Sequence, residues 1–204
     1  MRHYYAIAFL VAAGGFVRQA RTAPSTAEAG PPPVAVKFLG LFDQLRAANA
    51  AKARGEQQQV TFRLFDSEIN EYMQYSLKAV PRPGLESVTV KLFPNNYIST
   101  FTVVDFDAVE RWHPGTVPAI LRPLLNGKKS ISVDYRIQAQ DSKLSFSVEK
   151  AYYQSIRIPA FLVGEVIHIV AARQPEKYDT SKPVRIPFGL RRLWTSDHLI
   201  QGQN

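Results

Sequence analysis

The strongest constraint on this chain is a stretch of strict alternation that is followed by a turn and a second alternating stretch. In residues 130–140, SISVDYRIQAQ, every second side chain on one face is apolar, and residues 140–143, QDSK, favour a turn. A period of two places such side chains on one face of a β-strand. The even-numbered apolar pattern then runs from Leu144 to Ile158, which is far longer than a typical strand. We therefore expect one long strand there that is curved or bulged.

A second pair of alternating segments precedes this one. Residues 86–93, ESVTVKLF, and residues 97–106, YISTFTVVDF, are separated only by PNN. Two alternating runs joined by a short turn of proline and asparagine are typical of a β-hairpin. Further strands are predicted over residues 59–65 and as a C-terminal pair that turns near Ser196-Asp197.

The apolar period changes to about 3.6 residues in the predicted helices. Residues 34–54 and residues 66–80 each carry large apolar side chains along one stripe of a helix. Shorter helices are predicted in a segment capped by Asp107, over 117–125 and over 160–174. Because the strands come in hairpin pairs and do not alternate with helices, we predict an α+β fold. In this fold residues 34–204 form a single domain, with helices on one face of an antiparallel sheet.

The N-terminal residues predict export. Arg2 is followed by an unbroken run of small and apolar residues at 6–17, which is shorter than the ~20 residues that span a bilayer. We therefore interpret residues 1–29 as a signal peptide or N-terminal anchor with its linker. Arg18, directly after the apolar run, also suits an uncleaved anchor. The expected location is the periplasm or the outer face of the cytoplasmic membrane.

The composition excludes several classes of site and narrows the partners. The chain has no cysteine, so it has no disulfide, no thiolate zinc site and no cysteine nucleophile. Its formal charge of +8 suits anionic lipid surfaces or nucleic acid, but plain solubility is the favoured single explanation of this charge. Because an exported protein rarely meets nucleic acid, we expect no nucleic-acid partner.

No sequence motif for catalysis is present, and we expect neither an enzyme nor a cofactor or metal. The chain contains no nucleophile elbow, phosphate-binding loop or dinucleotide fingerprint, and no two histidines have the spacing of metal ligands. The pair Asp105 and Asp107 could bind a cation, but helix capping by Asp107 is the favoured interpretation. An enzyme would need a convergent site built from Asp105, His113 or His168.

The chain is unusually rich in apolar surface. On the helix that begins near Asp66, one stripe holds five large side chains, namely Phe65, Ile69, Tyr72, Met73 and Leu77. Long strands with one apolar face and helices with broad apolar stripes can form one thick core. They can equally enclose a slot for a lipid, which would gain ~0.8 kcal/mol for each buried methylene. The residues alone leave both interpretations open.

Two segments resemble a family of lipid-binding proteins. Glu68, Ile69 and Asn70 match the helix opening of the tubular lipid-binding superfamily, which includes SMP-like and BPI-like proteins. The ending Ile186, Pro187, Gly189 and Leu190 is similar to that of bacterial periplasmic phospholipid-binding proteins, with Asp197-His198 where the family often has Asp-Gly. The resemblance implies a long curved antiparallel sheet wrapped around one or more helices, with an elongated apolar groove. It also implies a carrier of lipid that performs no catalysis.

We therefore expect an exported, non-enzymatic lipid-binding or lipid-transfer protein that holds an acyl chain in an apolar groove and touches membranes peripherally. The expected lipid-binding residues are Ile69, Tyr72, Met73, Leu77, Phe146, Val148, Tyr152, Phe161, Val166, Ile167 and Val170. The expected membrane-contact residues are Trp112, Leu121, Leu124, Leu125, Lys128 and Lys129. The alternative is a structural or assembly protein of the cell envelope, with a fully packed core and a protein partner bound through a sheet edge or a basic face.

Overall fold

The structure is a computed structural model that describes residues 30–112, 114–115, 119, 122–159 and 183–204. Its helices are α2 (Pro33–Ala53), α3 (Asp66–Ala79) and α4 (Phe106–Trp112), with a 3-10 turn, η2 (Pro187–Gly189). Its strands are β1 (Thr61–Phe65), β2 (Leu85–Phe93), β3 (Tyr97–Asp105), β4 (Lys128–Gln140), β5 (Lys143–Tyr153), β6 (Ile156–Ile158), β7 (Val184–Arg185), β8 (Arg192–Ser196) and β9 (Leu199–Gln203).

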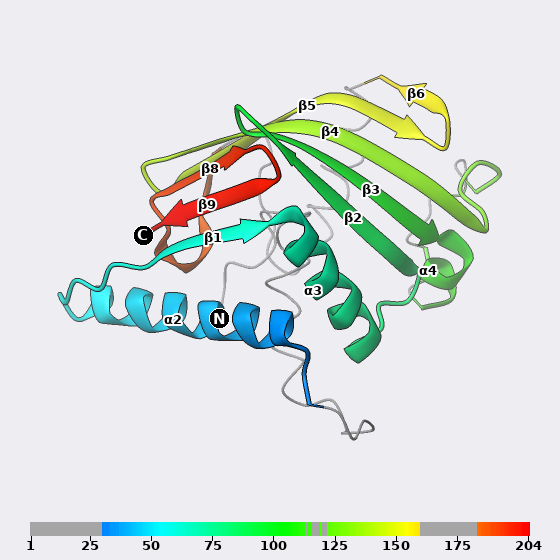
Figure 1. Cartoon of the computed structure of the whole chain (residues 1–204). Coiled ribbons are helices and arrows are strands. Elements are labelled where there is room, and N and C mark those ends of the chain that lie inside the picture. The colour runs from blue at the N-terminus through cyan, green and yellow to red at the C-terminus, as the bar shows by residue number, and fades with distance from the viewer. Residues whose placement is uncertain (1–29, 113, 116–118, 120–121, 160–182) are drawn as a thin grey trace.

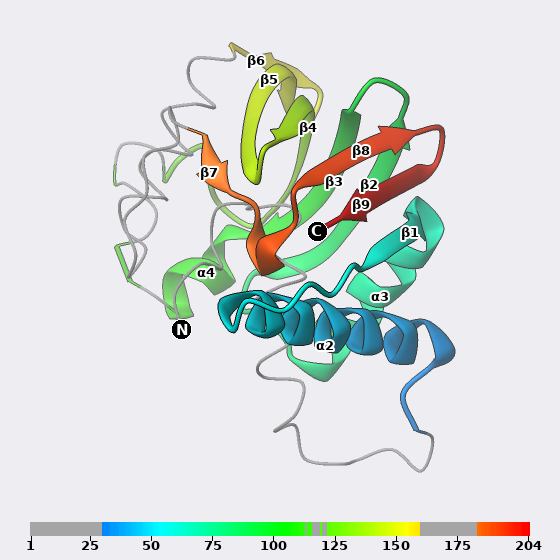
Figure 2. The same ribbon diagram turned by 90° about the vertical axis from the view of Figure 1, so that its left-hand side faces the viewer.

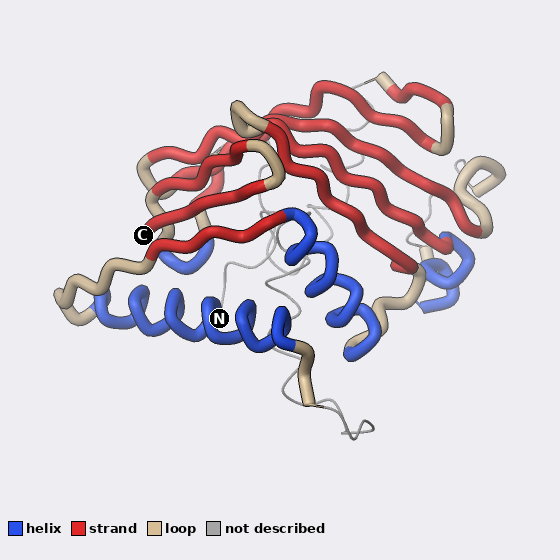
Figure 3. The backbone as a smooth tube through the Cα atoms, viewed as in Figure 1, coloured by secondary structure: helices blue, strands red, loops and turns tan. Residues whose placement is uncertain are grey.

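The strands form two antiparallel sheets. The large sheet has the order β2-β3-β4-β5-β6, with β7 paired to β5, and the small sheet has the order β1-β9-β8. In the described residues β2 and β6 remain unpaired edges, so the large sheet is not a closed barrel. Helices α2 and α3 lie on one side of the large sheet, with the small sheet between α2 and the large sheet (Figures 1 and 3). A quarter turn keeps both helices on that side (Figure 2). The predicted α+β class with antiparallel sheets is confirmed.

Short turns with left-handed backbone join the hairpins. Asn95 and Asn96 both have φ 61° between β2 and β3, and Asp141 and Ser142 have φ 52° and 62° between β4 and β5. Asparagine and aspartate tolerate this conformation better than other side chains, and such two-residue turns match the twist of the strands they join. The turns expected at PNN and QDSK are therefore confirmed.

The expectation of a single strand from Leu144 to Ile158 is wrong. The chain reverses at Gln154, which has φ 56°, and β6 returns antiparallel to β5. The register of β4 against β5 also shifts: Tyr135 lies opposite Val148, whereas the preceding residue lies opposite Lys150. One residue of β5 is thus extra, and such a bulge exchanges the faces of the strand beyond it.

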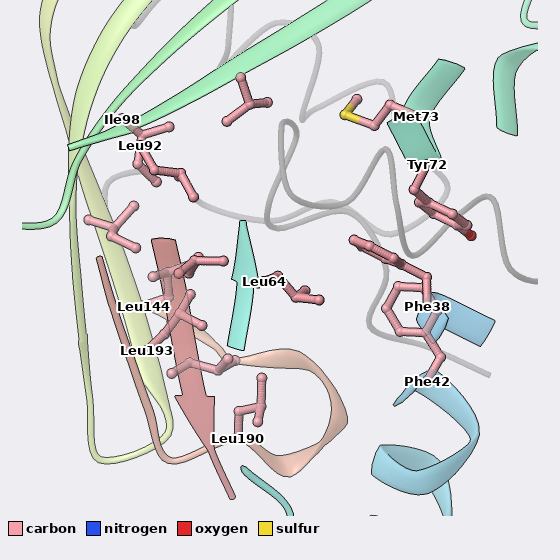
Figure 4. Packing of buried hydrophobic residues seen from close by; sticks show 14 of the residues in the cluster. Phe38, Phe42, Leu64, Tyr72, Met73, Leu92, Ile98, Leu144, Leu190 and Leu193 are labelled. Atoms are coloured by element: carbon pink, nitrogen blue, oxygen red, sulfur yellow. The ribbon is translucent and has the colours of Figure 1, made fainter. Parts of the chain in front are cut away.

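A single hydrophobic cluster joins α2, α3 and both sheets. The ring of Tyr72 on α3 stacks on Phe38 of α2, with centroids 4.4 Å apart and planes 5° apart. In Figure 4, Tyr72 points toward Phe38, whereas Met73 on the same helix points toward the sheets. Both side chains are buried, and burial raises the pKa of the Tyr72 hydroxyl to about 12. Helix α3 therefore packs on α2 and on the sheet at the same time.

The edge of the large sheet at β2 is covered by polar groups from other elements. The Asn70 amide donates to the Val90 carbonyl (2.9 Å) and its oxygen accepts from the Val90 N–H (2.7 Å). Two residues along β2, the Leu92 carbonyl accepts from the His198 N–H (3.0 Å), and the Leu92 N–H faces the Asp66 carboxylate at 3.4 Å. The backbone groups of Val90 and Leu92 are thus shielded from pairing with another strand.

Charged side chains fix the start of α3. Glu68 accepts from the Phe65 N–H (2.9 Å) and pairs with Lys37 of α2 (2.5 Å). Burial alone would raise the pKa of the Glu68 carboxyl, but these two partners outweigh it and lower the pKa. The His198 ring bonds Asp66 at 2.8 Å, and this carboxylate raises the pKa of His198. The first turn of α3 is therefore tied to α2 and to the β8–β9 turn.

We predict that Asn70→Ala lowers the free energy of unfolding by about 2–3 kcal/mol, because it removes two hydrogen bonds and leaves both backbone groups of Val90 without their partner. Urea denaturation followed by circular dichroism measures this loss. The control is Gln74→Ala, an exposed change on the same helix that should leave stability nearly unchanged. Equal stability of the two variants would contradict the role assigned to Asn70.

Candidate functional site

The two faces of the large sheet differ in chemistry. We call the side toward α3 and the small sheet the inner face. It carries Val88, Val90 and Leu92 on β2, Ile98, Thr100 and Thr102 on β3, and Val133, Tyr135 and Ile137 on β4, all of them buried. The opposite, outer face carries polar residues such as Ser99 and Ser132, with Phe101 left 47% exposed. Any apolar ligand of this sheet would therefore lie on the inner face.

Part of the inner face is only half-buried. Four apolar side chains on β4, β5 and β6, which we call the apolar quartet, keep partial exposure: Ile131, Phe146, Val148 and Ile158. The register places Ile131 opposite Tyr153, Val148 opposite Tyr135, and Ile158 opposite Ala151, all on the inner face. The quartet follows β5 and β6, away from the edge of the sheet that α3 covers.

One buried hydroxyl interrupts this apolar surface. Thr102 lies beside Ile131 in the sheet and is 7% exposed, and its hydroxyl has no hydrogen-bond partner among the described residues. The neighbouring Thr100 differs, because its hydroxyl donates to the Val133 carbonyl (3.2 Å). A buried hydroxyl without a partner costs free energy, so Thr102 is an unsatisfied polar group within the inner face.

Exposed apolar side chains gather where β3 ends, β4 begins and β5 turns into β6. Trp112 is 66% exposed, Leu124 is 53% exposed and Ile156 is 64% exposed. The Tyr153 hydroxyl donates to the Leu124 carbonyl and so ties the connection before β4 to the β5–β6 hairpin. Figure 1 shows α4 and the β5–β6 turn at this same end of the large sheet. We call Trp112, Leu124 and Ile156 the exposed end.

Two lysines begin β4 at this end of the sheet. Lys128 pairs with Glu86 of β2 at 3.0 Å. Lys129 lies opposite Val104 on the inner face and is half-buried, and it makes no ion pair with another described residue. A cation on the inner face beside the apolar quartet is a suitable partner for the negative group of an amphiphile.

The structure separates two groups of residues that we expected to form one slot. On α3, Tyr72 and Met73 are buried, while Ile69 and Leu77 are half-buried, and this helix packs on β2. Phe146 and Val148 lie on β5, three strand spacings away from β2, which is ~14 Å. The two groups therefore flank opposite sides of the inner face.

Other expected site residues have different positions or are not described. Because of the bulge and the reversal at Gln154, Tyr152 lies opposite Ser132 and Arg157 and thus on the outer face. Leu125 is half-buried beside the exposed Leu124. The remaining expected residues, which are Leu121, Phe161, Val166, Ile167 and Val170, lie outside the described residues.

Sequence reasoning missed four residues of this region, namely Thr102, Ile131, Ile156 and Ile158, as parts of a site. The alternation in residues 130–140 correctly places Ile131 on an apolar face. For Ile156, the only sequence signal of a strand reversal is the polar pair Gln154-Ser155, which forms the turn. Nothing in the sequence distinguishes the unpartnered hydroxyl of Thr102 from that of Thr100.

The structure places one of the acidic residues that the sequence offered as a cap or a ligand. Asp105 caps α4 by accepting from the Ala108 N–H (3.0 Å), so the expected cap, Asp107, is corrected to Asp105. No cluster of histidine, aspartate and glutamate among the described residues could hold a metal ion. His113 and His168 lie outside the described residues.

No protein-family model and no curated protein matches this chain in sequence. Among the described helices, none combines the length and the apolar character that crossing a bilayer requires.

We predict that Thr102→Val raises the free energy of unfolding by about 1 kcal/mol, because valine has nearly the same shape and removes a buried hydroxyl that lacks a partner. Thermal and urea denaturation measure the gain. Thr100→Val is the matched control on the same strand and should destabilise, since its hydroxyl is bonded. A loss of stability in Thr102→Val would show that this hydroxyl has a partner.

Proposed function

We propose that this protein is a non-enzymatic lipid-binding or lipid-transfer protein that holds an acyl chain in an apolar groove on the inner face of the large sheet. The observation that carries the proposal is the apolar quartet: Ile131, Phe146, Val148 and Ile158 pack at the margin of the core and remain only half-buried on the inner face. Apolar side chains that stay accessible together on one face of a soluble protein often mark a surface that binds a ligand. In this proposal the long sheet curves around its helices and keeps them apart from the quartet.

The polar groups beside the quartet support an amphiphile in a definite orientation. Lys129 lies nearest the exposed end, Thr102 lies next to Ile131, and Val148 and Phe146 follow further along β5. A phospholipid or similar ligand would place its negative group at Lys129, an ester oxygen at Thr102 and its acyl chain along the quartet. A few placed polar groups in an apolar site fix the orientation of a ligand in this way.

The exposed end supports a peripheral contact with membranes. Trp112 and Leu124 expose apolar surface at this end of the large sheet. Lys128 and Lys129 begin β4, directly after the connection that holds Leu124. Aromatic and aliphatic side chains beside lysines suit the interface of an anionic bilayer, where each cation contributes about 1 kcal/mol. The β5–β6 turn adds Ile156 to the contact residues that the sequence predicted. Such a contact agrees with the proposed export to the periplasm or the outer face of the cytoplasmic membrane.

Lipid retention tests the proposal. The full chain, expressed with its export signal and purified without detergent, should carry a phospholipid or another acyl ligand in native mass spectrometry. Phe146→Ala should lower the retained amount and weaken the uptake of a fluorescent phospholipid at least fivefold, because it removes apolar contact from the quartet. Thr102→Val should also weaken uptake, although it stabilises the protein without lipid.

Phe101→Ala is the matched control, since Phe101 is a phenylalanine on the outer face of the same sheet. It should leave lipid retention unchanged. A parent protein that carries no lipid and takes up none would exclude a carrier, and it would leave the packed envelope protein as the better interpretation. Equal uptake by Phe146→Ala and the parent would exclude the quartet as the site.

We predict that Trp112 enters the interface of anionic membranes. The chain has two tryptophans, and Trp194→Phe leaves Trp112 as the sole reporter. Its fluorescence should shift to shorter wavelength with vesicles of phosphatidylglycerol, because the indole moves out of water. Vesicles of phosphatidylcholine should cause a much smaller shift. An unchanged emission spectrum with both kinds of vesicle would contradict the proposed membrane contact.

A further inference from the structure

The free edge of the small sheet lies beside a groove on the other side of the core. The groove has a volume of about 430 Å³. One wall is α2, which contributes Val36, Lys37, Gly40, Leu41 and Gln44, and the other wall is β1, which contributes Thr61, Phe62, Arg63 and Leu64. Because four consecutive residues of β1 line it, the groove follows the edge of the strand and not one of its faces. In Figures 1 and 2, β1 runs alongside α2.

The backbone of β1 has unpaired groups along this edge. Asn204 donates to the Val60 carbonyl and Asp66 donates to the His198 carbonyl, so even-numbered residues of this segment bond toward β9. The N–H and carbonyl groups of Thr61 and Arg63 therefore point away from β9. They bond no other described residue across the edge. The N–H of Phe65, the next odd-numbered residue, is taken by Glu68.

The edges of β2 and β8 differ from the edge of β1, because side chains of other elements bond their backbone groups. The edge of β2 is covered by Asn70, Asp66 and the β8–β9 turn. On β8, the Thr195 N–H donates to the Asn96 side chain (2.8 Å) and its hydroxyl donates to the Phe93 carbonyl (2.6 Å). Proteins block exposed edges because these pair with other strands, so an edge left open beside a groove is suited to adding a strand from a partner.

The composition of the groove indicates which segment it would accept. Gly40 lies in the middle of α2, where glycine weakens a helix relative to alanine, and a Cβ atom placed there would meet nothing within 4 Å. Its missing side chain keeps the helical wall open. The lining includes two cations, Lys37 and Arg63, and no acidic residue. Lys37 forms an ion pair with Glu68, whereas Arg63 makes no ion pair with another described residue.

We propose that the groove between α2 and β1 binds an extended acidic segment of a partner protein, which adds to the small sheet as a fourth strand along β1. Its backbone pairs with Thr61 and Arg63. Alternate side chains of the segment are small or apolar and enter the groove over Gly40, and an acidic side chain on the other face lies against Arg63. The four residues of β1 span about 13 Å, so a segment of five or six residues suffices. This binding site is independent of the proposed lipid site.

The probe is a panel of six-residue peptides in which alanine, valine or leucine alternates with glutamate, together with the same peptides carrying lysine in place of glutamate. They are titrated into the ¹⁵N-labelled full chain. We expect saturable shifts of the Thr61 and Arg63 amide signals with glutamate peptides. A version of the best peptide with N-methyl groups on the amides that face β1 should bind at least tenfold more weakly, because it cannot pair as a strand.

Two variants test the groove without damaging the fold. Gly40→Leu fills the groove at an exposed helical position with a better helix former, so peptide binding should fall at least tenfold while the melting temperature does not fall. Arg63→Glu should reverse the preference from glutamate to lysine peptides. Phe146→Ala should bind the peptides like the parent, which separates this result from the lipid experiments.

Several outcomes would overturn the proposal. Absence of shifts at Thr61 and Arg63 with the whole panel would exclude a strand-binding edge. Equal binding of the N-methylated peptide, or of Gly40→Leu, would place any binding elsewhere. Shifts of the same two amides that depend only on protein concentration would identify a second copy of this chain as the occupant in place of an acidic partner.

Discussion

The architecture depends on the hydrogen bonds that hold α3 across the edge of β2. Asn70 uses its amide as a backbone group would and bonds both polar groups of Val90. Asp66, four residues earlier, faces Leu92 and also holds His198, whose own N–H bonds the Leu92 carbonyl. Helix α3, the small sheet and the large sheet therefore meet at two residues of one strand. On the same helix, Tyr72 stacks toward α2 and Met73 points toward the sheets, so α3 contributes to the core on both sides.

Local sequence patterns were sufficient for the parts of the fold that depend on neighbours in the chain. The alternation in residues 130–140 predicted β4, and the asparagines and aspartate of the turns predicted where the hairpins reverse. The helical stripe from Phe65 to Leu77 predicted α3 within two residues. Each of the three residues that carry the resemblance, Glu68, Ile69 and Asn70, has a contact in the structure. Glu68 caps the helix, Ile69 packs at the margin of the core and Asn70 bonds the sheet.

The sequence was less informative where a single residue changes the register or where distant elements meet. The bulge before Lys150 and the turn at Gln154 break a pattern whose apolar residues continue in even positions, so β5 and β6 looked like one strand. Asp105 and Asp107 are equally good caps by type, and only the start of α4 decides between them. Tertiary packing places α3 on β2, at the side of the inner face that lies away from β5. Periodicity shows which side chains share a face and does not show which faces meet.

This placement also decides how an amphiphile would reach the inner face. Moving α3 away from the sheet would break both bonds of Asn70 and separate the stacked rings of Tyr72 and Phe38. In the proposed carrier, reaching the apolar quartet requires no such rupture, because its side chains on β4, β5 and β6 are only half-buried. On β6, Ile158 lies two residues from the exposed Ile156, and the Tyr153 hydroxyl ties the β5–β6 hairpin to the connection that holds Leu124. If the protein carries lipid as proposed, a ligand would enter from the β5–β6 end, and the bonds of Asn70 to β2 would stay intact during loading.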